Sequence, residues 1–96
     1  MVIEWQRIRV RPDRRDLYIK KDGEIWTAGL AREEGFLGKE VWRGEGSEVV
    51  LVIRWRSEDD WKGIAQERLD ELDRRFRAVV PKDDWEKVEE RSYEVV

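Results

Sequence analysis

Strand-like and helix-like segments follow one another along the chain in an order that few folds can accommodate. Alternating or apolar β-rich segments occupy residues 2–10, 36–43, 49–56 and 88–96, which predicts four strands. The segments between the first two strands and between the last two carry helical spacing. The nearly continuous apolar run VVLVIRWR at 49–56 indicates a central strand covered on both faces. The hairpin turn between the second and third strands is rich in glycine (Gly44 to Glu48).

Two helices are predicted, over residues 12–33 and 57–79. Pro12 suits the first turn of the first helix, Gly23 predicts a kink near Asp22–Gly23, and Gly35 is a plausible stop. Ser57 can cap the second helix, whose apolar residues recur every three or four positions until Pro81. We expect residues 82–87 to be a polar connection and the last strand to lie at a sheet edge.

The resulting order, βαββαβ, predicts an α+β, ferredoxin-like fold in which two helices cover one face of a four-stranded antiparallel sheet. The other face keeps apolar side chains, from Trp5, Val50, Val52 and either Tyr93 or Val95. An apolar sheet face of this kind usually meets a partner. The simplest partner is a second copy of the chain related by a two-fold axis, so we expect a homodimer.

Composition limits the chemistry that the protein can perform. The 96 residues suit a single domain, 1–96, and the six Trp argue against disorder despite 45% charged residues. The absence of Cys and His removes thiol nucleophiles and the commonest metal and haem ligand. We therefore expect no cofactor. No apolar run reaches the roughly 18–20 residues of a membrane span, and the first residues lack a signal-peptide pattern, so a cytoplasmic protein without a membrane partner is expected.

The charges are unevenly distributed. The net charge is −3, which does not favour nucleic acid. Residues 1–21 carry seven basic side chains against three acids, whereas residues 81–96 carry three against six. We expect the two end segments to lie side by side and neutralise each other. The alternative is an anion-binding face made by Arg7, Arg9 and Arg11.

Several side chains are candidates for a ligand pocket between the helices and the sheet. Trp26, Trp55 and Trp61 could border a flat aromatic ligand, and they could equally fill the core as packing groups. Tyr18 could donate a proton or orient a ligand, or it could lie at the core edge with its hydroxyl in water. The candidate cavity-lining residues are Glu4, Gln6, Tyr18, Trp26, Trp55 and Trp61.

Glu4 and Gln6 share the strand face that is expected to look toward the helices. A glutamate in an apolar cavity would have a raised pKa and could serve as a base, although an ion pair with an arginine or a place at the solvent edge would explain it as well. The acid pairs Asp59–Asp60 and Asp83–Asp84 are better explained by helix starts and solvation than by metal binding.

The segment Gly35–Trp42 (GFLGKEVW), the strand ending in Trp55-Arg56-Ser57 and the following Trp61 resemble the antibiotic-biosynthesis-monooxygenase-like family. The resemblance implies a homodimer whose two sheets pack into an α/β barrel, with a small cavity in each subunit. Some members oxidise aromatic polyketides with O₂ without metal or flavin, and others bind and open haem. Gln6 falls near a position where haem-degrading members carry Asn, but they also need a His that this chain lacks.

Two hypotheses follow. The first is a small-molecule-binding protein, which could act as a cofactor-independent monooxygenase on an aromatic substrate. The second is a non-enzymatic structural or binding homodimer with a Trp-packed core. An enclosed pocket with a polar group favours the first, and a solid core would exclude it.

Overall fold

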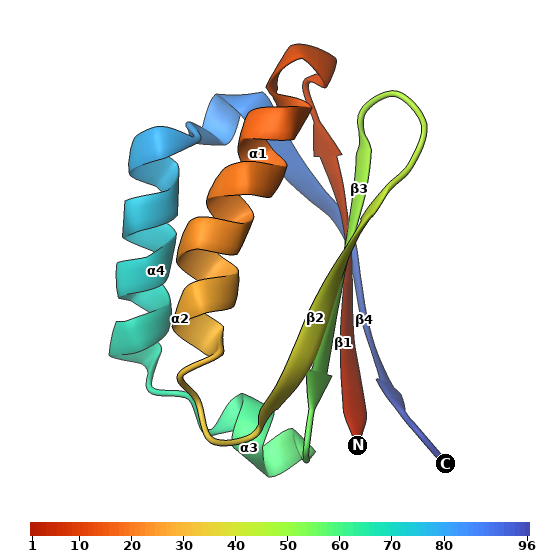
Figure 1. Ribbon diagram of the computed structural model, residues 1–96, viewed down its shortest axis with the longest axis vertical. Coiled ribbons are helices and arrows are strands. Elements are labelled where there is room, and N and C mark those ends of the chain that lie inside the picture. The colour runs from red at the N-terminus through yellow and green to blue at the C-terminus, as the bar shows by residue number, and fades with distance from the viewer.

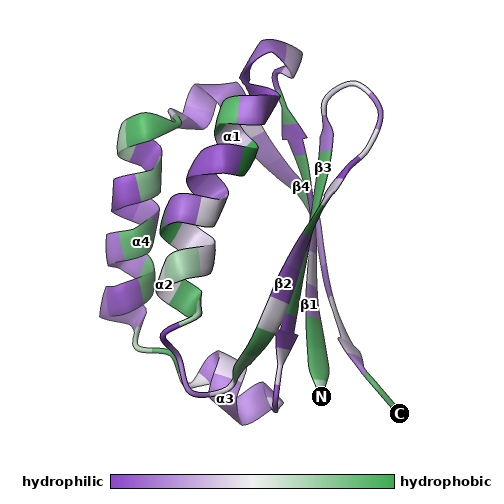
Figure 2. Ribbon diagram, in the orientation of Figure 1, coloured by the Kyte–Doolittle hydropathy of each residue, from purple (hydrophilic) through white to green (hydrophobic).

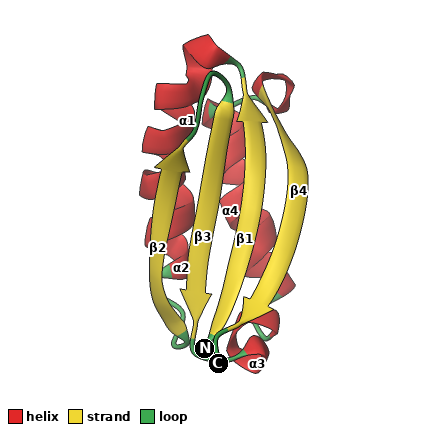
Figure 3. Ribbon diagram, turned by 90° about the vertical axis from the view of Figure 1, so that its right-hand side faces the viewer, coloured by secondary structure: helices red, strands yellow, loops and turns green.

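The computed structural model describes residues 1–96 as a single sheet with its helices on one side (Figure 1). The sheet is antiparallel, with strand order β2-β3-β1-β4. The predicted ferredoxin-like α+β arrangement is thus confirmed, and within one chain the sheet stays open (Figure 3). The strands are β1 (Val2–Val10), β2 (Phe36–Arg43), β3 (Glu48–Trp55) and β4 (Trp85–Glu94).

Strand β3 is central, as its apolar run predicted. It pairs with β1 on one side and β2 on the other. Val49, Leu51, Ile53 and Trp55 point toward the helices and belong to the hydrophobic core. The alternate residues of β3 face the opposite side of the sheet, because successive side chains on a strand point to opposite faces.

The first helical region is continuous but irregular. It begins with a 3₁₀ turn, η1 (Pro12–Arg14), continues as α1 (Arg15–Lys21), widens into a π-helical segment, η2 (Asp22–Thr27), and ends with α2 (Ala28–Leu30). A kink was expected near Asp22–Gly23, and the structure instead shows a change from α-helical to π-helical hydrogen bonding that begins there. The helix ends before residue 33, because the amides of Arg32 and Glu33 bond to carbonyls three residues back.

Gly35 does not end the helix in a left-handed conformation, as a helix-terminating glycine usually does. Its φ is not positive. A Cβ atom at this position would lie 2.2 Å from the Cβ of Asp60. Glycine is needed here because the chain passes directly against the start of α3.

The second helix is divided, so the prediction of one helix over 57–79 was wrong. A short helix, α3 (Glu58–Lys62), ends at Gly63, and α4 (Gln66–Val79) follows. Ser57 caps α3 as expected, since its Oγ accepts a hydrogen bond from the Asp60 amide at 3.1 Å. Figure 2 shows hydrophobic and hydrophilic residues alternating along α4, whose buried residues are Leu72 and Phe76.

Strand β4 is an edge strand, as predicted, but it begins three residues earlier than expected. A 3₁₀ turn, η3 (Lys82–Asp84), leads directly into Trp85, which pairs with Val10 of β1. The predicted polar connection over 82–87 therefore includes the start of the strand. A β-bulge leaves Val88 without a partner, because Ile8 pairs with Lys87 and Arg7 pairs with Glu89.

The two end segments neutralise each other, as the charge distribution predicted. Arg7 lies 3.2 Å from Glu89, Arg9 lies 3.6 Å from Glu86, and Arg11 lies 3.4 Å from Asp84. The alternative of an anion-binding face made by these arginines is not supported, because each already has a carboxylate partner.

The outer face of the sheet lies on the side away from the helices and is turned toward the viewer in Figure 3. Trp42 is 47% exposed and Tyr93 is 48% exposed. Val50 and Val52 also belong to this face and lie outside the core cluster.

None of the helices has the length and apolar character needed to cross a membrane.

Candidate functional site

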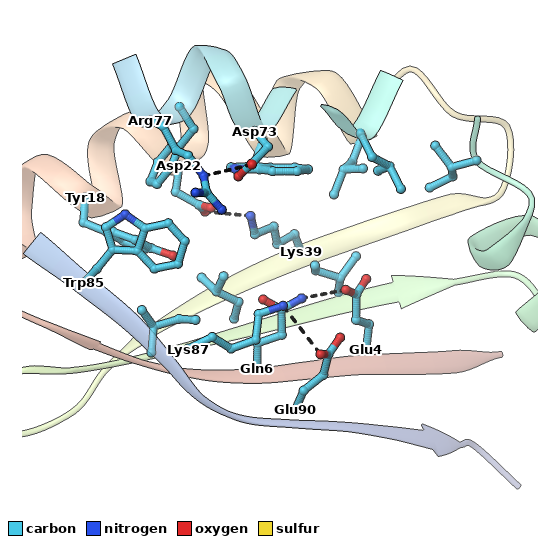
Figure 4. Close-up of a pocket in the computed structure, with 18 of the residues that line it drawn as sticks. Glu4, Gln6, Tyr18, Asp22, Lys39, Asp73, Arg77, Trp85, Lys87 and Glu90 are labelled. Atoms are coloured by element: carbon cyan, nitrogen blue, oxygen red, sulfur yellow. Dashed lines mark hydrogen bonds and ion pairs between the residues drawn. The ribbon is translucent and has the colours of Figure 1, made fainter. Parts of the chain in front are cut away.

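A pocket of about 350 Å³ lies between the inner face of the sheet and the helices (Figure 4). Small-molecule sites span about 300–1,000 Å³, so this pocket is at the lower end. A cavity of about 150 Å³ holds benzene. The pocket is therefore large enough for a ligand of about two fused rings.

Residues from every layer of the fold line this pocket. β1 contributes Glu4 and Gln6 from its inner face, and the end of β3 contributes Trp55. The first helical region contributes two aromatic residues and α3 contributes one. All six candidate residues from the sequence lie along the pocket: Glu4, Gln6, Tyr18, Trp26, Trp55 and Trp61.

The aromatic rings form the walls without filling the space. Tyr18, Phe76 and Trp85 pack edge to face in a triangle, with ring centroids 5.1–5.8 Å apart. Trp55 packs edge to face against Phe36 at 5.7 Å. Edge-to-face contacts are a preferred arrangement of aromatic rings, so these rings support one another in the walls of the pocket.

Glu4 is held on the sheet side of the pocket by two neutral donors. The Gln6 side-chain amide donates a hydrogen bond to one carboxylate oxygen at 2.6 Å, and the Trp55 indole N–H donates to the other at 3.1 Å. Burial raises the pKa of the Glu4 carboxyl above its ordinary value, and this effect outweighs the lowering by the two hydrogen bonds. The ion pair with an arginine considered from the sequence is absent.

Tyr18 is buried rather than set at the core edge. It is 3% exposed. Burial and the nearby Asp22 carboxylate both raise the pKa of its hydroxyl. Tyr18 therefore stays a neutral phenol, which can donate a hydrogen bond but cannot act as a base near neutral pH.

Eight charged side chains line the pocket, and three opposite pairs account for six of them. Lys39 lies 2.6 Å from Asp22, Arg77 lies 2.9 Å from Asp73, and Lys87 lies 3.5 Å from Glu90. The remaining two, Glu4 and Lys82, have no ion-pair partner. The Lys82 ammonium instead sits 3.6 Å from the centre of the Trp85 ring. Glu4 is therefore the one acid of the pocket that forms no ion pair, although the charge of Lys87 acts on it from farther away.

The Asp22–Lys39 pair was not anticipated from the sequence. Both side chains are only 1% exposed. Burial raises the pKa of Asp22, and the Lys39 ammonium opposes this by charge and by its hydrogen bond. The pair lies beside Tyr18 at the helical side of the pocket (Figure 4).

Two β-bulges explain why charged pocket residues were missed. In β2, Phe36 pairs with Trp55 and Gly38 pairs with Arg54, so Leu37 is the extra residue. This bulge turns Lys39 inward, whereas strict alternation from Phe36 would turn it outward. The bulge at Val88 likewise brings Glu90 opposite Gln6. Gly38 was the available signal for the first, since an isolated glycine in a strand suggests a bulge.

Trp85 was also missed, because it sits in a segment that reads as polar (KDDWEK). In each acid pair considered as a metal ligand, one carboxylate already has a basic partner. Asp60 accepts two hydrogen bonds from Arg56, at 2.7 and 3.0 Å. Asp84 pairs with Arg11 and with Arg14.

The fold is similar to those of several solved structures. HapK from Hahella chejuensis matches with a TM-score of 0.78 at 16% identity, over 100% of this chain and 93% of that protein. SnoaB, a cofactor-independent oxygenase from Streptomyces nogalater, matches with a TM-score of 0.69 at 17% identity, over 99% and 92%. At these identities the likeness shows the fold alone. No curated protein sequence matches the chain.

The family comparison covers most of the chain. The model of the antibiotic biosynthesis monooxygenase family matches residues 1–68. This range runs from β1 into the start of α4 and includes all six candidate pocket residues predicted from the sequence. The resemblance first noted in the segments around Gly35–Trp42 and Trp55–Trp61 is confirmed, and the chain belongs to the antibiotic biosynthesis monooxygenase family.

Proposed function

We propose that the protein binds a small planar aromatic molecule in this pocket and oxidises it with O₂, without a metal or organic cofactor. The observation that carries the proposal is Glu4, a carboxylate with a raised pKa that forms no ion pair, inside a pocket walled by aromatic rings. Membership of the monooxygenase family supports the reaction class. The pocket volume supports a ligand of about two rings.

Glu4 is the proposed general base. Its carboxylate removes a proton from a ring CH₂ that is activated by a conjugated carbonyl, and the electron pair of the C–H bond moves into the ring and onto the carbonyl oxygen. The resulting enolate reacts with O₂ at carbon, where a C–O bond forms. Loss of water leaves a new C=O, so that CH₂ and O₂ become C=O and H₂O. The raised pKa suits a base that works near neutral pH.

Gln6 and Trp55 are proposed to position this base. Their hydrogen bonds hold both carboxylate oxygens, which limits rotation of the Glu4 side chain. The walls formed by Trp26 and Trp61 would hold a flat ring over the sheet. Holding the ring and the Glu4 carboxylate in this orientation turns a reaction between two free molecules into a reaction within one complex.

The test is oxygen consumption with a panel of enolisable two-ring ketones, beginning with 2-tetralone, which has a CH₂ between a ring and a carbonyl. We expect Glu4→Gln to lower kcat/KM by about 10²–10⁴-fold while quenching of tryptophan fluorescence by the ketone is retained. The kcat/KM of the unsubstituted protein should rise with pH through the raised pKa of Glu4 and then level off. Ligand binding without oxygen consumption across the panel would favour the non-enzymatic binding protein.

We also propose that the protein pairs with a second copy through the outer face of the sheet. Trp42 and Tyr93 are about half exposed there, and Trp5 lies between them on β1, paired with Val52 and Arg91. Exposed aromatic groups that gather on one sheet face favour association. A two-fold pairing of two such faces would bury them.

A further inference from the structure

The Asp22–Lys39 ion pair has no adequate explanation in stability alone. Both side chains are 1% exposed. Burial of two charges costs more than their attraction returns unless their geometry is excellent, and apolar residues of similar size often stabilise a protein equally well. The pair also lies where the helix widens into a π-helical segment, which begins at Asp22. Such segments are frequent at functional sites.

The Lys39 ammonium retains hydrogen-bonding capacity toward the pocket. Its one hydrogen bond goes to Asp22 Oδ2, at 2.6 Å. An ammonium carries three N–H donors, so two of them have no protein partner. Lys39 lines the pocket, where the bulge at Leu37 has turned it inward. Figure 4 shows its side chain reaching into the space between the helices and the sheet.

The register of the sheet places Lys39 and Glu4 in one row. Glu4 pairs with Ile53 across β1 and β3, and Ile53 pairs with Lys39 across β3 and β2. Neighbouring strands lie about 4.8 Å apart, so the backbones of Glu4 and Lys39 are separated by roughly 10 Å. The apolar side chain of Ile53 lies between them and provides a floor for a ring.

We propose that Lys39, held in place by Asp22, stabilises the negative charge that a bound ligand acquires on an oxygen atom. This inference rests on the proposed function, because Glu4 is the base that creates the charge. When the C–H bond breaks, the proton goes to Glu4 and the electron pair moves to the ring oxygen, which accepts a hydrogen bond from Lys39. The ligand class is accordingly an aromatic ring system with a carbonyl oxygen that becomes conjugated with the carbon losing its proton.

Asp22 serves as a positioning residue in this arrangement. While no anionic ligand is bound, its carboxylate neutralises the charge of the Lys39 ammonium. The hydrogen bond between them also fixes the direction of that ammonium. Tyr18 stays protonated beside the pair, since burial and Asp22 both raise its pKa. It therefore adds no competing negative charge.

The test measures the preference of the pocket for an anionic ligand over a neutral one, with no turnover involved. The probes are 4-nitrophenol, whose phenolate absorbs visible light, and nitrobenzene, which is uncharged. We expect the unsubstituted protein to bind 4-nitrophenolate and to favour it over the neutral phenol by about tenfold or more. Nitrobenzene binding, followed by quenching of tryptophan fluorescence, reports on the apolar walls alone.

Two variants separate the charge of Lys39 from the integrity of the fold. The double variant Asp22→Leu with Lys39→Met replaces the pair by apolar groups, so no charge is left buried alone. It should lose the preference for phenolate and keep nitrobenzene binding. Asp22→Asn leaves the Lys39 ammonium without the carboxylate that positions it, so it should weaken the preference while nitrobenzene binding is kept. Lys20→Met removes an exposed lysine of α1 that does not line the pocket, and it is the matched control that should leave the preference unchanged.

The outcomes distinguish the two proposals. Unchanged phenolate preference in the double variant, with nitrobenzene still bound, would overturn the role of Lys39 and leave the proposed function standing. Failure of the unsubstituted protein to bind either probe would overturn the aromatic pocket, and the role of Lys39 with it. A loss of preference in Lys20→Met equal to that of the double variant would assign the effect to general charge and refute the inference.

Discussion

At the scale of single residues, Glu4 is kept in an environment that disfavours its charge. The side chain accepts two hydrogen bonds, yet burial still raises its pKa. A structural carboxylate would ordinarily gain from a nearby cation, and every other acid of the pocket has one. The cost that Glu4 imposes on the folded state should therefore be measurable.

We predict that Glu4→Gln becomes more stable relative to the unsubstituted protein as pH rises. Since the folded pKa exceeds the unfolded value, the folded state binds more protons between the two, and the free energy of unfolding falls as pH rises through that window. The slope is at most about 1.4 kcal/mol per pH unit. Urea unfolding from pH 4 to pH 8 checks this, and parallel curves for the two proteins would contradict it.

The site residues that the sequence placed correctly on β1 lie in a regular part of the structure. Strand β1 pairs without interruption with β3, so its alternation correctly set Glu4 and Gln6 toward the helices. Lys39 and Glu90 could not be placed by the same reasoning, because each follows a bulge that reverses the alternation. A one-residue shift in a strand exchanges its faces, and no periodic pattern reports where the shift occurs.

At the scale of elements, the first helical region contains two glycines that differ in how closely other atoms pack against them. A Cβ at Gly23 meets nothing within 4 Å, whereas a Cβ at Gly29 would lie 2.5 Å from Leu72 Cδ2. The two glycines therefore play different roles within one helix. Gly29 allows close approach of the helix to α4, and Gly23 has no such role.

We predict that Gly23→Ala stabilises the protein by about 1 kcal/mol, the difference in helix propensity. Gly29→Ala should destabilise it, because overpacking costs about 1–3 kcal/mol and the propensity gain offsets only part of that cost. Chemical unfolding of the two variants under identical conditions provides the comparison. Equal effects would show that the packing of the helix against Leu72 adjusts freely.

Element order was predictable and several element boundaries were not. Ser57 and the acids after it marked a helix start correctly, because capping depends on neighbouring residues only. The break at Gly63 between α3 and α4 was missed, since the apolar spacing continues across it through Trp61, Ile64 and Leu69. Periodicity reports which side of a segment is buried and is insensitive to a short interruption.

At the scale of the whole molecule, the two faces of the sheet have different roles. The inner face carries the pocket, and the outer face carries Trp42 and Tyr93 in exposed positions. The proposed pairing of two chains uses the outer face only. The pocket and the proposed dimer surface can therefore be altered independently.

We predict that Trp42→Glu shifts the protein from dimer to monomer, because it places a charge within an apolar contact. Light scattering coupled to size-exclusion chromatography measures the mass of the 11.6 kDa chain directly. Val79→Glu, at a residue of α4 that is 40% exposed, is the matched control and should leave the mass unchanged. A monomer before any substitution would refute the proposed pairing.

The bulge at Val88 has a consequence for how this protein family can diverge in length. β4 holds one residue more than its partner strand requires, and the pairs on either side, Ile8 with Lys87 and Arg7 with Glu89, are already in place. A deletion of Val88 would restore a regular ladder without exchanging the faces of the strand. A one-residue deletion usually exchanges the faces of a strand, but at this position it would leave the side chains that line the pocket on the same face.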